Sequence, residues 1–144
     1  IKEMWFKKDT ADLIIASRYV SGGRSDASFD RKILSVILNK FFSFVLSLPI
    51  KDISSGFRMY SKAIINDLVC EANGYDFLIE ILVRIYAKGG KIKEVPLHYL
   101  ARKKGRSHVK LFKFGIAYCF TLMKMLKLKH SMDFYQRSFS ADCL

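Results

Sequence analysis

The sequence is poor in the residues that build disulfide frameworks and zinc sites. Its three cysteines are odd in number and widely spaced, and its three histidines are scattered along the chain. No Cys-x-x-Cys pair or other Cys/His spacing typical of a metal site occurs. The pattern therefore argues against a disulfide framework and a zinc site, and it favours a reducing compartment.

The first residues lack both an initiator methionine and the uncharged apolar core of a signal peptide. Residues 1–8 (IKEMWFKK) instead mix charged and large apolar side chains. This amphipathic stretch is expected to be the tail of a helix that begins upstream, which would make the chain a fragment of a longer protein.

Acidic residues are scarce relative to basic ones. The 144-residue chain has 25 Lys and Arg against 13 Asp and Glu, a formal net charge of +12. Such a balance predicts an anionic partner, which could be nucleic acid, lipid headgroups or a phosphorylated substrate. Disorder is excluded by the 12 Phe, the 7 Tyr and the long apolar runs, which suffice for one domain with a core.

The pattern of apolar residues predicts strands that alternate with helices. Residues 11–17 hold a continuous apolar run with β-branched residues, which predicts a buried strand, and the Gly- and Ser-rich residues 18–30 predict a loop. Dense apolar residues at 31–48, stopped by Pro49, predict a helix that is deeply buried or faces lipid.

The next part of the chain predicts two further strands and two further helices. They are a loop and short strand at 52–60, a helix at 61–72, a helix at 76–88 and a strand at 91–100. Gly89 and Gly90 are expected to close the second helix, and Pro96 places the last strand at an edge or bulge. The result is an α/β layered fold with a mixed sheet and flanking helices, in which part of the sheet is expected upstream.

A basic loop is expected at 101–110 and a helix at 111–128. The uncharged core of this helix, 114–123, is ten residues long, whereas a membrane span needs about 20. The helix could lie in a membrane interface with its lysines at the headgroups, or pack on the sheet with its lysines in water. Its aromatic and Met content favours the membrane surface.

Five segments follow one another along the chain in the order of a known family. They are residues 12–23 (DLIIASRYVSGG), 31–35 (RKILS), 48–60 (LPIKDISSGFRMY), 75–82 (YDFLIEIL) and 93–107 (KEVPLHYLARKKGRS). Together they resemble the dolichol-phosphate mannosyltransferase-like branch of the family 2 glycosyltransferases. The resemblance covers residues 11 to about 110 and depends on five collinear matches rather than on any one of them.

The resemblance implies a GT-A, Rossmann-like fold that transfers a sugar from a nucleotide sugar to a polyprenyl or dolichyl phosphate with inversion. It implies Mg²⁺ or Mn²⁺ for the complete enzyme and a membrane-associated location at the cytoplasmic face. The family's nucleotide-binding half, with its Asp-x-Asp metal motif, precedes the matched part, and this sequence contains no Asp-x-Asp.

By itself the chain is therefore expected to lack donor and metal binding and to be inactive. Residues 1–110 would be the C-terminal part of the catalytic domain, and residues 111–144 an amphipathic helix and tail that could lie in a membrane interface.

Transfer to a phosphate needs cations more than a base, because the attacking oxygen is already ionised at neutral pH. Arg18 follows the end of a predicted buried strand, where ligands of open α/β sheets gather. Ser35 lies one helical turn after Arg31, near a helix N-terminus. The resemblance assigns Arg18, Arg31 and Ser35 to the acceptor phosphate; the alternative is that both arginines are surface charges in weak salt bridges.

Residues 52–58 (DISSGFR) form the expected sugar and diphosphate loop. Asp52 is predicted as a catalytic residue that touches the sugar or orders the loop. Gly56 allows a close approach of the backbone, and Ser54 and Ser55 offer hydroxyls.

Arg58, at the start of a strand, also belongs to this loop, but a structural pair between Arg58 and Glu80 is the preferred interpretation. Asp76 and Glu80 are spaced i, i+4 and could act as an acid–base couple. The structural alternative is favoured, because Asp76 suits a helix N-terminus and Glu80 has Arg84 one turn on.

The basic run 102–107 (RKKGRS) matches the family's Arg-x-x-Gly-x-Ser-Lys loop, which closes over the diphosphate and the acceptor. The resemblance gives Arg102 a catalytic role and places Gly105 and Ser107 in the loop. His108 stands where the family usually has Lys, which would weaken phosphate binding at neutral pH or make it pH-sensitive. From its residues alone, this run is interpreted as a solvated basic loop.

Two other classes of function stay open. A nucleic-acid-binding module fits the charge, but the aromatic residues fall in apolar helices and no zinc-finger, RNP or KH signature occurs. A membrane-surface interaction protein that has lost catalysis is the other possibility. An Asp-x-Asp after an apolar strand upstream would favour the enzyme.

Overall fold

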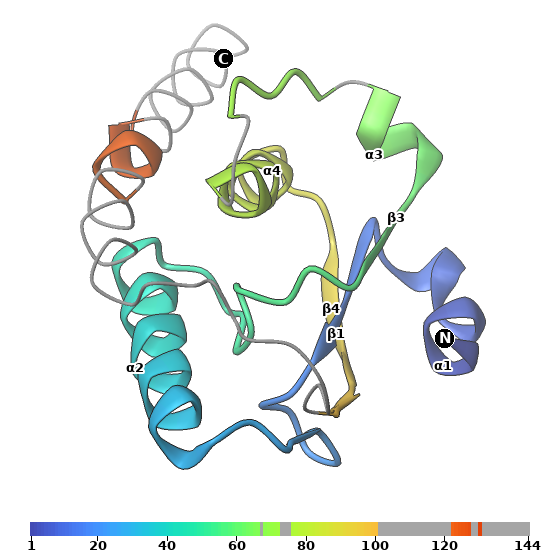
Figure 1. Ribbon diagram of the computed structural model, residues 1–144. Helices are drawn as coiled ribbons and strands as arrows, with labels where there is room; N and C mark the ends of the chain where they lie inside the picture. The colour runs from blue at the N-terminus through green and yellow to red at the C-terminus, as the bar shows by residue number, and fades with distance from the viewer. Residues whose placement is uncertain (67, 73–75, 101–121, 128–129, 131–144) are drawn as a thin grey trace, which may run out of the picture.

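The computed structural model describes residues 1–66, 68–72, 76–100, 122–127 and 130 of the chain (Figure 1). Three strands form the central sheet, in the order β3-β1-β4. Strand β1 (Leu13–Ser17) lies in the middle, β3 (Arg58–Tyr60) runs antiparallel to it, and β4 (Ile92–Pro96) runs parallel to it. The predicted mixed sheet of an α/β fold is therefore confirmed.

Strand β1 is buried on both faces, as its unbroken apolar run predicts. All five of its residues are buried. Leu13 and Ile15 belong to the larger core cluster, whereas Ile14 and Ala16 pack with Met4 in a second cluster. Successive side chains of a strand point to opposite faces, so a strand covered on both sides needs apolar residues throughout.

Two helices cover one side of the sheet, and a short helix lies on the other side (Figure 1). The first two are α2 (Phe29–Val45) and α4 (Asp76–Ala87), and the short one is α1 (Lys2–Phe6). A short 3-10 helix, η1 (Lys8–Thr10), links α1 to β1. The expected helical segment at the start of the chain and the helix at 76–88 are thus confirmed.

Helix α2 confirms the helix predicted at 31–48, although it begins and ends two or three residues earlier. It ends at Val45 because Ser47 adopts a positive φ of 52°, the left-handed conformation that often follows a helix, just before Pro49. At the end of α4, Gly89 has a φ of 75° and Gly90 donates to the Ile85 carbonyl. The glycine pair therefore closes α4 as predicted.

The helix predicted at 61–72 is wrong in length. Helix α3 (Lys62–Asn66) is short, and residues 68–72 are not helical. The backbone amides of Glu71 and Ala72 donate to the side chain of Glu80. Their hydrogen bonds are thus made to α4 rather than to carbonyls of a continuing helix.

The strand predicted at 91–100 is divided into two. After β4, the chain forms β5 (His98–Tyr99), which pairs in parallel with β2 (Arg24–Ser25). Strand β2 lies inside the stretch predicted as a loop. Pro96 ends β4 at an edge of the sheet, which is one of the two positions predicted for it.

Of the helix predicted at 111–128, residues 122–127 are helical, and the rest lies outside the described residues. Within the described part of the chain, no helix is both long enough and apolar enough to cross a bilayer. Cys70, the one cysteine among the described residues, is a free thiol.

Candidate functional site

Polar side chains from three elements meet at the C-terminal end of β1. Arg18 follows the last residue of the strand, the loop at residues 51–55 passes beside it, and the inward face of α2 lies against that loop. The open end of such a sheet is where α/β folds commonly bind ligands.

Arg18 and Asp52 form a two-point ion pair. The Nε atom of Arg18 donates to Oδ2 of Asp52 at 2.8 Å, and its Nη2 atom donates to Oδ1 at 2.7 Å. The backbone amide of Arg18 also donates to Oδ2 at 3.0 Å. Asp52 is fully buried, with 0% of its surface exposed. Both oxygens of the carboxylate therefore serve to hold Arg18.

The ion pair with Asp52 favours the charged form of Arg18. The hydrogen bond with Asp52 raises the pKa of Arg18 above its ordinary value, although burial acts in the opposite direction. The guanidinium also lies 5.0 Å from the centre of the Tyr19 ring, a cation–π distance. Arg18 is thus a fixed cation whose position is set from two sides.

Ser54 joins the pair to helix α2. Its Oγ accepts from Arg18 Nη2 at 2.7 Å and from Asn39 Nδ2 at 3.1 Å, and it donates to Asp52 at 3.2 Å. One donor and two acceptor positions are all that a hydroxyl has. Ser55 donates to the Ala16 carbonyl at 2.6 Å in a buried position. Both hydroxyls predicted to meet the sugar or diphosphate thus have protein partners that order the loop.

Ser35 presents its hydroxyl on the inward side of α2. Tyr19 Oη lies 2.8 Å from Ser35 Oγ, and Asn39 Nδ2 lies 3.3 Å from the same atom and 2.7 Å from the Ser35 carbonyl. Two donors directed at one hydroxyl oxygen leave its own proton for an outside acceptor. The structure thereby links predicted residues Arg18 and Ser35 through Tyr19, Asn39 and Ser54.

Arg31 lies one turn before Ser35 on α2, as the spacing predicts, but its side chain is exposed. It makes no hydrogen bond or ion pair with the described residues. The structure therefore includes Arg18, Ser35 and Asp52 in one network and leaves Arg31 at its solvent side.

Glu94 and Gly23 also shape the site, and no pattern in the sequence indicated the role of Glu94. The Glu94 carboxylate accepts from the backbone amides of Lys51 at 2.9 Å and Asp52 at 3.0 Å, which fastens the loop to β4. A Cβ on Gly23 would lie 2.7 Å from the Ser17 carbonyl oxygen. The turn after β1 therefore needs glycine there. Gly56, by contrast, has only the Leu78 side chain at 3.8 Å, so none of the described residues requires the close approach predicted for it.

The predicted pair between Arg58 and Glu80 is wrong. Arg58 donates to the backbone carbonyls of residues 53, 55 and 78, and burial lowers its pKa. Its donors are thus used to fasten the 53–55 segment to α4. Three carbonyls accept hydrogen bonds from the Arg58 guanidinium, so its N–H donors need no carboxylate partner.

Glu80 is fully buried and has other partners. It accepts from the amides of Glu71 and Ala72 and from Arg84 Nε at 2.8 Å, one turn along α4. Burial alone would raise the pKa of Glu80, but these hydrogen bonds outweigh burial and lower it. The structural alternative with Arg84 is therefore the one found, and Asp76 marks the first residue of α4.

The described residues do not fit a metal ion. No group of three His, Cys, Asp or Glu side chains that could hold one occurs among them. The carboxylates of Asp52 and Glu94 are both occupied by N–H donors. The predicted basic loop, with Arg102, Gly105, Ser107 and His108, lies outside the described residues.

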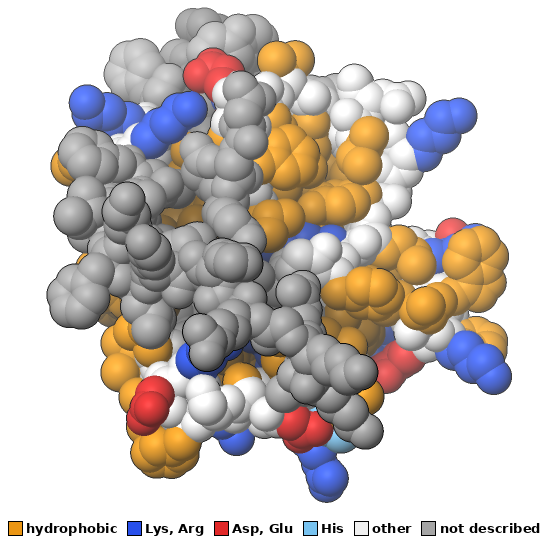
Figure 2. Space-filling view, viewed as in Figure 1, with side chains coloured by type: hydrophobic (Ala, Val, Ile, Leu, Met, Phe, Trp, Pro, Cys, Tyr) orange, Lys and Arg blue, Asp and Glu red, His pale blue; other side chains and the backbone are white. Residues whose placement is uncertain are grey.

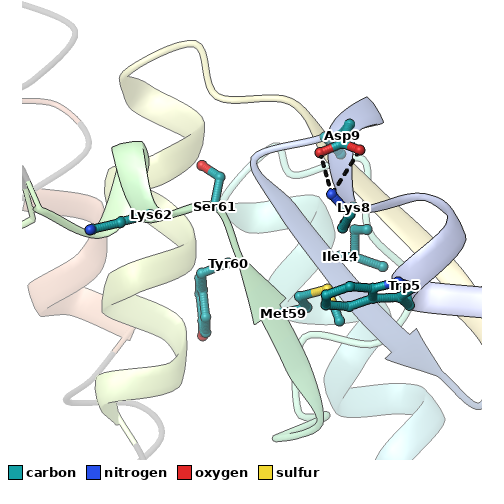
Figure 3. Close-up of a pocket in the computed structure, with 9 residues that line it drawn as sticks. Trp5, Lys8, Asp9, Ile14, Met59, Tyr60, Ser61 and Lys62 are labelled. Carbon is teal, nitrogen blue, oxygen red and sulfur yellow. Dashed lines mark hydrogen bonds and ion pairs between the residues drawn. The ribbon is translucent and has the colours of Figure 1, made fainter. Parts of the chain in front are cut away.

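A cavity of about 340 Å³ lies away from this network, between α1, η1 and β3 (Figure 3). Trp5 and Met59 lie side by side in it, and Lys8 is paired with Asp9 at its rim (Figure 3). Asp9 is itself exposed, and the second lysine of the lining, Lys62, is also exposed. Among the described residues, neither lysine is held by a buried carboxylate as Arg18 is held by Asp52.

Comparison with known proteins gives two informative relatives. The polyprenol monophosphomannose synthase of Mycolicibacterium smegmatis is 34% identical over 101 residues, which are 67% of this chain and 38% of that protein. The undecaprenyl-phosphate mannosyltransferase of Micrococcus luteus is 35% identical over 103 residues, which are 68% of this chain and 42% of that protein. The chain thus spans about two fifths of the length of these curated relatives. No protein-family model matches it. The similarity confirms the resemblance that the five sequence segments predict.

Proposed function

We propose that this chain, which is related to polyprenyl-phosphate glycosyltransferases, supplies the acceptor-binding part of an enzyme that transfers a hexose, with mannose as the first candidate, to a polyprenyl phosphate. The observation that carries the proposal is the fixed orientation of the Arg18 guanidinium. It is held by the buried Asp52 at the end of β1 and linked to Ser35 on α2. A fixed guanidinium beside an oriented hydroxyl is suited to a phosphate group.

Arg18 and Arg31 would contribute to phosphate binding in different ways. Asp52 cancels the charge of Arg18, so Arg18 contributes directed N–H donors more than net attraction. Its Nη1 atom has no hydrogen-bond partner among the described residues and can meet a phosphate oxygen. Arg31 is exposed and unpaired there, so it would contribute long-range attraction.

The reaction itself would be a single displacement with inversion. A phosphate oxygen of the acceptor forms the new bond to the anomeric carbon of the sugar. The bond between that carbon and the diphosphate of the nucleotide sugar breaks, and its electron pair leaves with the diphosphate. The acceptor oxygen is already ionised, so the residues of this chain need only hold it in line.

The donor and its metal ion belong, in this proposal, to a part of the enzyme outside this chain. Strand β3 is an edge of the described sheet, so a further strand can pair with it and extend a GT-A fold. Mg²⁺ or Mn²⁺ would neutralise the diphosphate there. The basic loop from Arg102 to His108 would close over the phosphates, as the family resemblance implies.

A membrane surface is the proposed location, because α2 has an apolar outer face. Five large apolar residues of α2 are exposed: Phe29, Ile33, Ile37, Phe41 and Phe44. They occupy about a third of the helix circumference and lie opposite Ser35 and Asn39. Hydrophobic side chains reach the surface at the lower end of α2, and Lys and Arg project around the rim of the view (Figure 2).

This apolar stripe of α2 fits a bilayer with anionic headgroups. The net charge of +12 favours such a surface, and a polyprenyl phosphate presents its phosphate there. A helix with its apolar face in the interface would hold Ser35 on the protein side of the same helix. The proposed location is the cytoplasmic face, whose leaflet carries the anionic lipids that a basic protein favours.

The test is the acceptor KM of the complete enzyme after Arg18→Ala. A charge-assisted contact is worth about 1.5–3 kcal/mol, so the KM for polyprenyl phosphate should rise tenfold or more. The KM for the nucleotide sugar should change little. Lys91→Ala is the matched control, because Lys91 is exposed and lies next to the opposite end of β1. Equal small effects of both variants on both substrates would refute the acceptor site.

A further inference from the structure

Asn39 is a buried amide on a helix whose neighbouring positions are mostly apolar. It is 3% exposed and, with Phe42, is one of the two residues of α2 that are buried. A polar side chain at such a position lowers stability unless its hydrogen bonds are made. The bonds that Asn39 makes therefore indicate what it does.

The Asn39 amide binds Ser54 at two points. Its Oδ1 accepts from the Ser54 backbone amide at 3.0 Å, and its Nδ2 donates to Ser54 Oγ at 3.1 Å. The same Nδ2 donates to the Ser35 carbonyl one turn earlier, at 2.7 Å. Asn39 thus holds the loop at residues 51–55 against α2, and it also binds Ser35 on the same helix.

Ser54 links Asn39 to the guanidinium of Arg18. Its Oγ accepts from Arg18 Nη2 at 2.7 Å, so the guanidinium is oriented by a hydroxyl that Asn39 itself orients. Without Asn39, the Ser54 amide would be left unpaired and its hydroxyl could rotate away from Arg18. The distance between Arg18 at the end of β1 and Ser35 on α2 would then no longer be fixed.

We propose that Asn39 is a positioning residue that sets Arg18 and Ser35 at the separation the acceptor phosphate requires. It acts on Arg18 through Ser54 and on Ser35 by direct hydrogen bonds, and it does not touch the substrate. The inference rests on the proposed function, since it assumes that Arg18 and Ser35 hold the acceptor. Asn suits the role because its amide offers both a donor and an acceptor in one plane.

The first test measures both KM values of the complete enzyme for Asn39→Ala, Ser54→Ala and the double variant. Asn39→Ala should raise the KM for polyprenyl phosphate about tenfold, equal to about 1.4 kcal/mol, and leave that for the nucleotide sugar within about twofold. Because both residues act in one chain of contacts, the double variant should be little worse than the worse single variant. Additive effects would overturn the proposal.

A control separates positioning from packing. Val45 is a half-buried residue of α2 that packs on the core. Val45→Ala should lower thermal stability without a selective change in acceptor KM. If it reproduces the kinetic pattern of Asn39→Ala, then Asn39 acts only through the stability of α2, and the proposal is wrong.

A second variant gives a pH signature that a packing role would not produce. Asn39→Asp keeps the shape and one acceptor, but its ionised form cannot donate to Ser54 Oγ and lies near the buried Asp52. Burial and the like charge should raise the pKa of the introduced carboxyl. On protonation it can donate again, so the acceptor KM of this variant, relative to the parent, should fall as pH is lowered from about 8 to 6. A ratio that is flat with pH would count against the proposal.

The kinetics of the variants distinguish an error in the acceptor site from an error in the role of Asn39. If Arg18→Ala leaves the acceptor KM unchanged, the acceptor site itself is wrong. If Arg18→Ala raises it tenfold but Asn39→Ala and Asn39→Asp leave it unchanged, only the role of Asn39 is wrong.

Discussion

Arg18 and Arg31 carry the same charge in different surroundings. Arg18 is held by Asp52, Ser54 and the ring of Tyr19, whereas Arg31 is exposed to solvent. Salt screens exposed charges strongly, since the Debye length falls from about 10 Å at 0.1 M to about 3 Å at 1 M. Directed hydrogen bonds from a fixed group are much less sensitive.

We therefore expect the two arginine variants to differ in their dependence on salt. In the complete enzyme, Arg31→Ala should raise the acceptor KM several-fold at low ionic strength, and the ratio to the parent should approach one near 1 M salt. The ratio for Arg18→Ala should stay high throughout. The measurement is acceptor KM against salt concentration for both variants and the parent. If the acceptor KM of the two variants depended on salt in the same way, the two arginines would have the same role in phosphate binding.

Glu80 makes stability depend on pH. Its pKa is lowered in the folded protein, because three N–H partners outweigh the effect of burial. A group with a depressed pKa contributes stability above its unfolded pKa and loses that contribution as pH falls through its folded pKa. Glu80→Gln should therefore lower the free energy of unfolding at pH 7, and the difference from the parent should shrink below about pH 4.

The measurement is urea unfolding at several pH values. Glu71→Gln is the matched control, since the Glu71 side chain is 71% exposed and its contact with Arg84 is long, at 3.9 Å. This variant should have a small effect at every pH. An equal loss for both variants at pH 7 would contradict the role given to Glu80.

Sequence reasoning found the residues of the site whose position in the chain is informative. Arg18 stands directly after a recognisable strand, and Ser35 follows Arg31 by one helical turn. Asn39, Tyr19 and Glu94 were missed because their roles depend on contacts across long stretches of chain, such as Glu94 to the Asp52 amide. The Arg58 and Glu80 error has a related cause, since a sequence does not reveal which backbone carbonyls will surround an arginine.

At the scale of elements, α2 carries two functions on opposite faces. Its inward face holds Ser35 and Asn39, and its outward face carries the apolar stripe. The sequence predicted a helix apolar nearly all round, buried or facing lipid. It could not separate the faces, because core packing and lipid contact select the same side chains.

The stripe predicts membrane binding that one residue should weaken. Phe44→Ser removes an aromatic side chain that is 85% exposed and should weaken binding to vesicles of an anionic phospholipid about tenfold, as expected for a largely buried Phe. Phe6→Ser is the matched control, because Phe6 is 83% exposed on α1, on the other side of the sheet. Vesicle co-sedimentation measures both. Equal losses for the two variants would show that α2 has no special place at the membrane.

At the scale of the whole molecule, the α/β class and most elements followed from the sequence. Apolar runs and Gly or Pro stops determine elements locally, so β1, α2 and α4 were predicted within a few residues. The order β3-β1-β4 and the small β2-β5 sheet were not predicted, because pairing depends on which distant segments meet. Residues 68–72 were assigned to a helix for the same reason, since the acceptor of their amides lies on α4.

The chain by itself should show no sugar transfer and no measurable Mn²⁺-dependent nucleotide binding. It spans about two fifths of its curated relatives, and its described residues hold no metal-binding group. The edge of β3, which has no further strand among the described residues, should also promote self-association. Isothermal titration calorimetry with nucleotide and Mn²⁺ tests the first point and analytical ultracentrifugation the second. A tight, metal-dependent nucleotide site would contradict the proposed division of the enzyme.

The central position of β1 has a consequence for how the protein reaches its fold. Leu13 pairs with Tyr60 on one side and with Ile92 on the other, so neither partner is its neighbour in the chain. During synthesis, at about 5–20 residues per second, β1 leaves the ribosome several seconds before β4. Loop closure must also precede any pairing, which slows folding. The central strand of the described sheet is therefore the one that stays longest without its partners, and its four apolar residues, Leu13 to Ala16, are the segment that a chaperone would hold.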